Sequence, residues 1–462
     1  MKIFSKRLLA SAIIAGLAMP VVSHATNGYM LIGYGAKSRA MGGVGVARGQ
    51  DGLAAAFNPA TMADVADKLT AEKNWRFDIG GDIFKPKAQV YHDADPLLTN
   101  SAVDQETGAP STGFSTSNGY YLLPAMGFVS KIDKQLSWGF AMIGSGAAAK
   151  YDQSLPAGDG SYFFNFNGLG GDKLEIRLMN LQMLPSLAYK INDQHTVGAT
   201  LVISASLFKA NGLLAFEELG FGASAGNLSD QGTDTSFGGG LRLGWKGKFI
   251  EDKLHIGVNY SSRTYMSEFD DYKNLFAEQG DFDIPSNYAI GFAYDISPEI
   301  TTYLDIQQIN YSEVASVGNK GPNITGDFFP CGNIECGALG LDEGLGFGWE
   351  DQTIIKLGVS WAYSPELILR AGYNHADNQI PKDQVLFNML APAVVEDHLT
   401  MGASYIFSET MELSMSYVHA FENTVTGQSP FQPAGTTPDN LVENTSLTMK
   451  QNSIGATLGI KF

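Results

Sequence analysis

A possible nucleophile occurs at residues 222–226, where Gly-Ala-Ser-Ala-Gly matches the G-x-S-x-G pattern of hydrolases. In a hydrolase this serine sits on a sharp turn between a strand and a helix. Here the motif lies in a polar, glycine-rich stretch that is typical of a loop between strands. The seven histidines show no paired ligand spacing, and residues 36–38 (Ala-Lys-Ser) lack the glycine that a phosphate-binding loop places before its lysine. We therefore expect neither an enzyme nor a bound cofactor.

The only two cysteines are Cys331 and Cys336, in the longest polar stretch of the chain. Two thiols without nearby histidines do not complete a metal site, so no metal is expected. The N-terminus carries three basic residues, an apolar run over residues 8–19 and a small-x-small cleavage site at residues 23–25, the pattern of a secretory signal peptide. In an exported protein the two cysteines are expected to form a small disulfide.

Composition narrows the class of protein further. The formal net charge of the 462 residues is −18, and such an acidic chain excludes nucleic acid as a partner because phosphate contacts need a basic surface. Beyond the signal peptide, no stretch reaches the ~18 consecutive apolar residues that a membrane-spanning helix needs, although 44% of residues are hydrophobic. Any membrane-spanning elements must therefore be strands.

The last strand of the chain alternates strictly between apolar and polar side chains. From Ile454 to the terminal Phe462, every second residue is apolar, and the residues between them are Gly, Thr or Lys. Side chains of a strand point to opposite faces with period two, so one face is apolar and the other polar. The same pattern recurs at residues 288–296, 355–363, 399–407 and 411–417. It predicts strands that face lipid on one side and a polar lumen on the other.

Short and long connections alternate along the chain. Six short clusters of turn-forming residues end apolar strands, at 132–135, 191–194, 250–253, 296–299, 363–366 and 407–410. Seven longer polar stretches lie between them, the longest at about 317–348. These connections predict an all-β fold, a transmembrane antiparallel β-barrel of about 14 strands. A closed barrel has no free edge, so we expect a monomer. A soluble, secreted β-sandwich protein is the alternative.

The chain divides into three expected parts: a signal peptide at 1–25, an N-terminal hatch at 26–66 and the barrel at 67–462. Residues of the second part are small, rich in Gly and Ala and compatible with helix. Such a segment can fill the lumen of a barrel as a plug. Asn58 is a competent helix cap and Pro59 suits a first helical position, so with Ala60 they are expected to fix how the segment leaves the lumen.

The hatch resembles the N-terminal hatch of the FadL/TodX family of outer-membrane channels for hydrophobic compounds. The similarity rests on residues 27–29 (Asn-Gly-Tyr), 35–43, and above all 57–60 (Phe-Asn-Pro-Ala), and extends to the C-terminal hairpin at residues 412–419. The resemblance implies a bacterial outer-membrane location, and a ligand that enters through an apolar extracellular groove and leaves sideways beside a kinked third strand. Our third strand, residues 137–149, contains Gly144, Ser145 and Gly146, which suit such a kink.

The ligand class implied by the resemblance depends on whether a cation faces the pocket. Members that take fatty acids are expected to hold the carboxylate with basic residues, and Lys209, on our fifth strand at residues 201–216, is the candidate. Our ninth strand, residues 301–314, has no Lys or Arg. We predict long-chain fatty acids as ligands, with neutral aromatic hydrocarbons as the alternative.

Two further classes of function remain open: a general porin and a surface adhesin or receptor. A plugged lumen argues against an open porin. Large acidic loops could bridge through divalent cations to lipopolysaccharide, which together with outer-membrane lipid is an expected partner.

Overall fold

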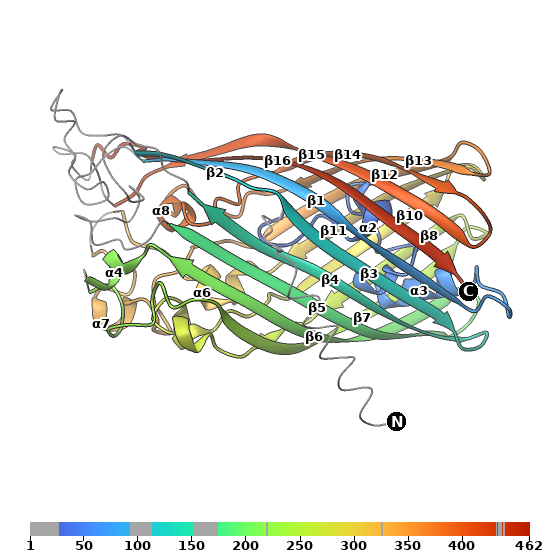
Figure 1. Cartoon of the computed structure of the whole chain (residues 1–462), viewed down its shortest axis with the longest axis horizontal. Coiled ribbons are helices and arrows are strands. Elements are labelled where there is room, and N and C mark those ends of the chain that lie inside the picture. Colours follow the sequence, from blue (N-terminus) through green and yellow to red (C-terminus); the bar gives the residue numbers. More distant parts are fainter. Residues whose placement is uncertain are drawn as a thin grey trace.

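The computed structural model describes residues 27–92, 113–151, 174–218, 220–324, 327–430, 432, 437 and 439–462. The expected signal peptide at 1–25 lies outside these residues. The described chain forms an elongated antiparallel β-barrel (Figure 1). Its strands are β1 Trp75–His92, β2 Gly113–Asn118, β3 Tyr121–Lys131, β4 Leu136–Lys150, β5 Glu175–Lys190, β6 His195–Asn211, β7 Asp234–Phe249, β8 Leu254–Ser261, β9 Tyr265–Met266, β10 Asn287–Asp295, β11 Ile300–Ile309, β12 Gln352–Ala362, β13 Leu367–Ala376, β14 Asp397–Ile406, β15 Met411–Gly427 and β16 Thr445–Lys461.

The barrel closes where the last strand pairs with the first, from Arg76 opposite Lys461 to His92 opposite Thr445. The wall of the described barrel is fourteen strands round, although sixteen strands are named. At two places, two strands that are close in sequence pair with the same neighbouring strand. β3 pairs with the first half of β1 and β2 with its second half, and β8 and β9 both pair with β7. The predicted barrel of about 14 antiparallel strands is therefore confirmed.

Apolar side chains of the strands lie on the outside of the barrel and polar side chains on the inside, an inside-out arrangement relative to a soluble protein. On β16, Ile454 is 57% exposed whereas its neighbour Ser453 is 2% exposed. On β14, Leu399 and Met401 are exposed and Thr400 between them is buried. Exposed apolar side chains therefore face lipid and buried polar side chains face the lumen, as period-two strands in a membrane require.

All six predicted short turns lie between the strand pairs expected, from residues 132–135 between β3 and β4 to residues 407–410 between β14 and β15. They gather at the end of the barrel that holds the C-terminus (Figure 1). Two predicted strands extend too far towards the C-terminus. The fifth predicted strand ends at Asn211 (β6), and the ninth ends at Ile309 (β11), because short helical turns follow each.

The helices are short. In the described part of the chain, four precede the barrel: α2 Gly35–Arg39, η1 Ala54–Ala56, η2 Pro59–Thr61 and α3 Met62–Ala66. Seven lie in the long connections: α4 Leu214–Glu218, η3 Asp270–Tyr272, α5 Ala277–Gly280, η4 Tyr311–Glu313, α6 Ala315–Gly318, α7 Ile334–Gly337 and α8 Val385–Asn388. Among the residues described, no helix is both long and apolar enough to span a membrane.

Candidate functional site

The chain ahead of β1, residues 27–69, is packed inside the barrel and is called the N-terminal segment below. Each residue from 27 to 66 is buried or half-buried. Its helix α2 contacts β1, β14, β15 and β16, whereas η2 contacts β5, β6 and β7. These strands lie on different sides of the wall, so the segment crosses the lumen. The labels α2 and α3 accordingly fall within the outline of the barrel (Figure 1).

Strand side chains hold the backbone of the N-terminal segment. Asp305 on β11 accepts hydrogen bonds from the amides of Gly45 (2.8 Å) and Val46 (3.1 Å). The Lys356 ammonium on β12 donates to the carbonyl oxygen of Ile32 at 3.1 Å. Further contacts of the same kind are Gly42 with Thr400, Gly52 with Asp78, and Ala36 with Thr457. Short irregular helices leave many backbone groups unpaired, and the polar lumen wall satisfies them.

Asn58 is the clearest example of this fit. It is the N-cap of η2, where its side-chain oxygen accepts from the amide of Ala60 at 3.0 Å, and Pro59 follows as the first helical residue. Its amide nitrogen donates to the carbonyl oxygens of Val46 (2.8 Å) and of Trp245 on β7 (3.0 Å). One fully buried side chain thus joins two parts of the segment to the wall.

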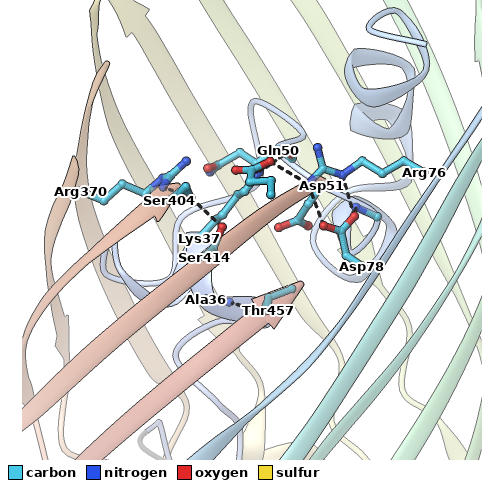
Figure 2. A network of polar contacts seen from close by, with 12 residues as sticks. Ala36, Lys37, Gln50, Asp51, Arg76, Asp78, Arg370, Ser404, Ser414 and Thr457 are labelled. Carbon is cyan, nitrogen blue, oxygen red and sulfur yellow. Dashed lines mark hydrogen bonds and ion pairs between the residues drawn. The ribbon is translucent and has the colours of Figure 1, made fainter. Parts of the chain in front are cut away.

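Charged side chains form a second set of ties. Lys37 pairs with Glu412 of β15 at 2.8 Å, and Glu412 also pairs with Arg76 of β1 at 3.2 Å. Arg76 in turn pairs with Asp78 at 2.7 Å. Figure 2 shows Lys37 between Arg370 on one side and the Arg76–Asp78 pair on the other. Burial lowers the pKa of Lys37, and Glu412 opposes that shift.

Two more buried pairs join the segment to other strands. Arg39 pairs with Asp82 of β1 at 2.9 Å, and Asp64 pairs with Lys246 of β7. Buried charges are stable only when they are paired. The N-terminal segment is therefore held at many points round the lumen, not at one hinge.

An apolar pocket lies between the N-terminal segment and the long connections. One side is formed by Tyr29 of the segment and by the inward side chains Ala147 (β4), Leu178 (β5) and Phe208 (β6). The rest comes from the long connections and is almost wholly aliphatic or aromatic: Leu213, Phe216, Leu275, Phe276, Phe282, Val317, Leu339, Leu345, Phe347, Trp349, Phe387 and Leu390. No Lys, Arg, Asp or Glu of the described chain lines it.

The few polar groups in this lining already have partners. The Ser316 hydroxyl donates to the carbonyl oxygen of Asp281 at 2.5 Å, and the indole nitrogen of Trp349 donates to Asn388 at 2.6 Å. The Tyr29 hydroxyl lies 3.5 Å from the carbonyl oxygen of Asp283. The pocket consequently offers an apolar surface and no spare charge.

The strand ladder is interrupted beside this pocket. β3 pairs with β4 only from Lys131 opposite Ser137 to Ala125 opposite Ile143. β4 nevertheless continues to Lys150 and stays paired with β5 over its whole length. The next residue of β3 is Pro124, which has no N–H to donate. Among the described residues, backbone pairing resumes at an isolated bridge between Ser117 and Tyr151.

The sequence candidates Gly144, Ser145 and Gly146 occupy the start of this interruption. A β-carbon at Gly144 would lie 3.9 Å from Pro124, so the two chains remain close there. The amide of Gly146 donates to the carbonyl oxygen of Tyr29 at 3.2 Å. The N-terminal segment therefore supplies a backbone partner where β3 does not.

The candidate cation Lys209 does not face the pocket. Leu178 and Phe208 are opposite each other and both point into the pocket, so the adjacent pair, Arg177 and Lys209, points out of the barrel. The Lys209 ammonium lies 3.4 Å from Glu175. The prediction that Lys209 meets a ligand carboxylate in the lumen is wrong, because the strand alternation puts it on the outer face.

The remaining sequence candidates lie in the long connections. Cys331, just ahead of α7, forms a disulfide with Cys336 within that helix. Ser224 of the hydrolase-like motif hydrogen-bonds with Asn274 at 3.1 Å. Among the described residues, no cluster of His, Cys, Asp and Glu is placed to hold a metal.

A second cavity, of about 680 Å³, lies on the other side of the N-terminal segment, towards the short turns. Its lining is strongly charged and includes Lys37, Arg48, Lys68, Arg76, Arg370 and Glu412. An apolar molecule would lose the hydrophobic contacts of the first pocket in this polar space. The two cavities thus favour different solutes.

Comparisons with known proteins agree with this architecture. Residues 25–462 match the sequence family described as outer membrane protein transport protein (OMPP1/FadL/TodX). The P. putida toluene transporter TodX superposes with a TM-score of 0.63 at 17% identity, covering 93% of this chain and 99% of TodX. A Pseudomonas aeruginosa FadL homologue gives 0.66 at 13% identity, covering 94% and 99%.

The monoaromatic hydrocarbon channel CymD gives a TM-score of 0.57 at 17% identity, with 93% of this chain and 98% of CymD covered. At these identities the solved structures show a shared fold. No curated protein sequence matched the chain. The family match spans nearly the whole chain, and the inside-out barrel with a segment in its lumen agrees with it. The chain therefore belongs to the OMPP1/FadL/TodX family of outer-membrane channels for hydrophobic compounds.

Proposed function

We propose that this channel takes up hydrophobic compounds without a charged headgroup, monoaromatic hydrocarbons among them. The observation that carries this proposal is the lining of the apolar pocket, which contains no cation among the described residues and no polar group without a partner. A buried carboxylate without a cation would lose its hydration with no compensating pair. A neutral ring or alkyl chain gains ~0.8 kcal/mol per buried CH₂ instead.

Fatty acids, favoured by the sequence, lose their main support with the outward orientation of Lys209. Arg263 lies near the pocket, but its guanidinium is already used. It pairs with Asp283 at 2.5 Å and with Asp281 at 3.2 Å. A ligand carboxylate would have to compete with two carboxylates of the chain itself.

We further propose that the ligand leaves sideways into the membrane through the β3–β4 interruption. Ala147 and Tyr29 line the apolar pocket, and the residue next to Ala147, Gly146, is held by the Tyr29 carbonyl. The pocket therefore adjoins the interruption. Exit along this path avoids the charged cavity beyond the N-terminal segment and spares an apolar ligand contact with water.

Equilibrium binding tests the choice of ligand. The detergent-purified barrel is titrated with toluene and with a long-chain fatty acid, as wild type, Leu178→Lys and Lys209→Ala. We expect wild type to prefer toluene, and Leu178→Lys, which adds a cation to the pocket, to lose about tenfold or more in toluene affinity. Lys209→Ala should leave both affinities unchanged. Wild-type preference for the fatty acid, lost in Lys209→Ala, would contradict the proposal.

A further inference from the structure

Two pairs of like charges lie on the outer wall of the barrel, one on each side of the β3–β4 interruption. Lys87 on β1 is directly opposite Lys450 on β16. On the other side, Arg177 on β5 is directly opposite Lys209 on β6. Like charges facing each other across a ladder are destabilising unless an anion lies between them.

Both pairs point outwards. Ala88 and Met449, the neighbours of the first pair, are fully buried in the lumen, so Lys87 and Lys450 face the opposite side. The neighbours of the second pair, Leu178 and Phe208, line the apolar pocket. All four cations therefore lie on the surface that meets the membrane.

The height of the first pair matches the lipid headgroups. The exposed apolar band on this side ends at the cross-strand neighbours Ile83 and Ile454, each 57% exposed. Lys87 lies four residues further along β1, about 13 Å along the strand. With a strand tilt of about 40°, this is ~10 Å beyond the apolar band, where lipid phosphates lie. The second pair is likewise near the extracellular end of its strand, since β6 ends at Asn211.

The carboxylates of the described chain neutralise these cations only in part. Glu422 pairs with Lys450 at 2.8 Å and also attracts Lys87, and Glu175 lies 3.4 Å from Lys209. Neither Lys87 nor Arg177 forms an ion pair with another described residue, so one carboxylate stands against two cations on each side. Lys85, which faces the same side as Lys87, lies 4.9 Å above the exposed ring of Tyr120, in the break between β2 and β3. The surface beside the interruption thus keeps an excess of positive charge although the whole chain carries −18.

We propose that the pairs Lys87/Lys450 and Arg177/Lys209 bind the phosphate groups of lipopolysaccharide in the outer leaflet, on both sides of the β3–β4 interruption. Lysine and arginine form strong, charge-assisted hydrogen bonds with phosphate oxygens. One phosphate between the two members of a pair removes their repulsion. Their long stems lie along the apolar wall while the charged ends reach the headgroups. Bound lipid would then lie on both sides of the break in β3–β4 pairing. This inference does not depend on which ligand the pocket binds.

Native mass spectrometry of the full-length barrel tests this inference, with lipid A carrying both phosphates and dephosphorylated lipid A as probes. We expect wild type to retain the phosphorylated form about tenfold better. Lys87→Gln/Lys450→Gln and Arg177→Gln/Lys209→Gln should each reduce that preference, and the four changes together should abolish it. Lys87→Arg/Lys450→Arg should keep it, because the charge remains.

Lys134→Gln/Lys253→Gln, which removes two cations from short turns at the opposite end, serves as the matched control and should retain the full preference. Circular dichroism and heat-dependent gel mobility establish that each variant is folded. The inference is overturned if wild type retains both lipids equally, or if the folded fourfold variant still prefers the phosphorylated form. It is also overturned if the control loses the preference as much as the paired variants do.

Discussion

The amide nitrogen of Gly146 lies 3.2 Å from the carbonyl oxygen of Tyr29, so the N-terminal segment is hydrogen-bonded to β4 where β4 loses its partner on β3. An unpaired backbone amide is costly in a membrane protein, and this contact removes that cost. It also places the ring of Tyr29 in the lining of the apolar pocket. A displacement of Tyr29 would therefore change the pocket and the interruption together.

Gly146→Ala is expected to weaken this contact. The φ angle of Gly146 is +153°, and a β-carbon there would lie 2.2 Å from the carbonyl oxygen of Leu178. Backbone strain of this kind costs about 1–3 kcal/mol. The melting temperature of the purified barrel should fall, and uptake of toluene into proteoliposomes should change. Gly144→Ala, two residues away, is the matched control, because its β-carbon would have 3.8 Å of room. Equal effects of the two variants would contradict this account.

Replacement of Asn58 should loosen the N-terminal segment. Asn58→Ala removes the cap of η2 and leaves the carbonyl oxygens of Val46 and Trp245 without donors, a loss of about 2–4 kcal/mol. Asn58→Asp keeps the cap oxygen but turns a carboxylate towards those two carbonyls, so it should be more harmful at pH 7 than at pH 4. Ion conductance in planar bilayers measures both. Wild-type conductance in Asn58→Ala would show that this residue does not hold the segment.

The effects of replacing Asp64 and Lys246, which form a buried pair, on the free energy of unfolding should not be additive. Either single change, Asp64→Leu or Lys246→Met, leaves one buried partner unmatched, and the cost is about 3–5 kcal/mol for an uncompensated charge. The double variant Asp64→Leu/Lys246→Met should recover much of that loss. Chemical unfolding of the four proteins gives the coupling between the two sites. Additive losses in the double variant would show that the two charges do not stabilise each other.

The strands of the barrel wall could be predicted from the sequence much better than the contacts of the N-terminal segment inside it. Turn residues such as those at 363–366 and the alternation around Ile454 are local signals, and local signals determine strand ends and lipid-facing sides. Lys37 and Glu412 are 375 positions apart, so no local pattern could pair them. Lys209 was misplaced because residues 206–209 (Ser-Leu-Phe-Lys) show no clear apolar face, and only the register with β5 decides which side is inward.

The sequence contains a local signal for the interruption. Pro124 lies eight residues before the predicted turn at 132–135, inside the apolar stretch that ends there, and a proline inside a strand marks an edge or a break in the ladder. The inward charges Arg76, Asp78 and Asp82 were a second signal, since three charged residues on one face of a strand need partners. Together they indicate that something polar fills the lumen beside β1.

The stability of the folded loop between β8 and β10 should depend on pH. Burial and the neighbouring carboxylate of Asp283 raise the pKa of Asp281 to about 7, while Arg263 acts in the opposite direction. The folded loop thus holds this proton more tightly than the unfolded loop, in which an Asp titrates near ~3.9. Stability from this group is full below pH ~4 and falls as the pH rises through about 7. The hydrogen-exchange protection factors of residues 262–286, from which the intrinsic pH dependence of exchange is removed, should therefore fall between pH 5 and 8.

Asp281→Asn should remove that dependence, because the amide does not titrate and keeps a similar shape. Asp377→Asn, an exposed carboxylate in another connection, is the matched control and should leave the pH profile of residues 262–286 unchanged. Since Ser316 donates to the Asp281 carbonyl and also lines the apolar pocket, loosening of this loop should reach the pocket. Toluene affinity of the wild type should accordingly be higher at pH 5 than at pH 8, and Asp281→Asn should bind equally at both. An identical pH dependence in Asp281→Asn would assign the effect to another group.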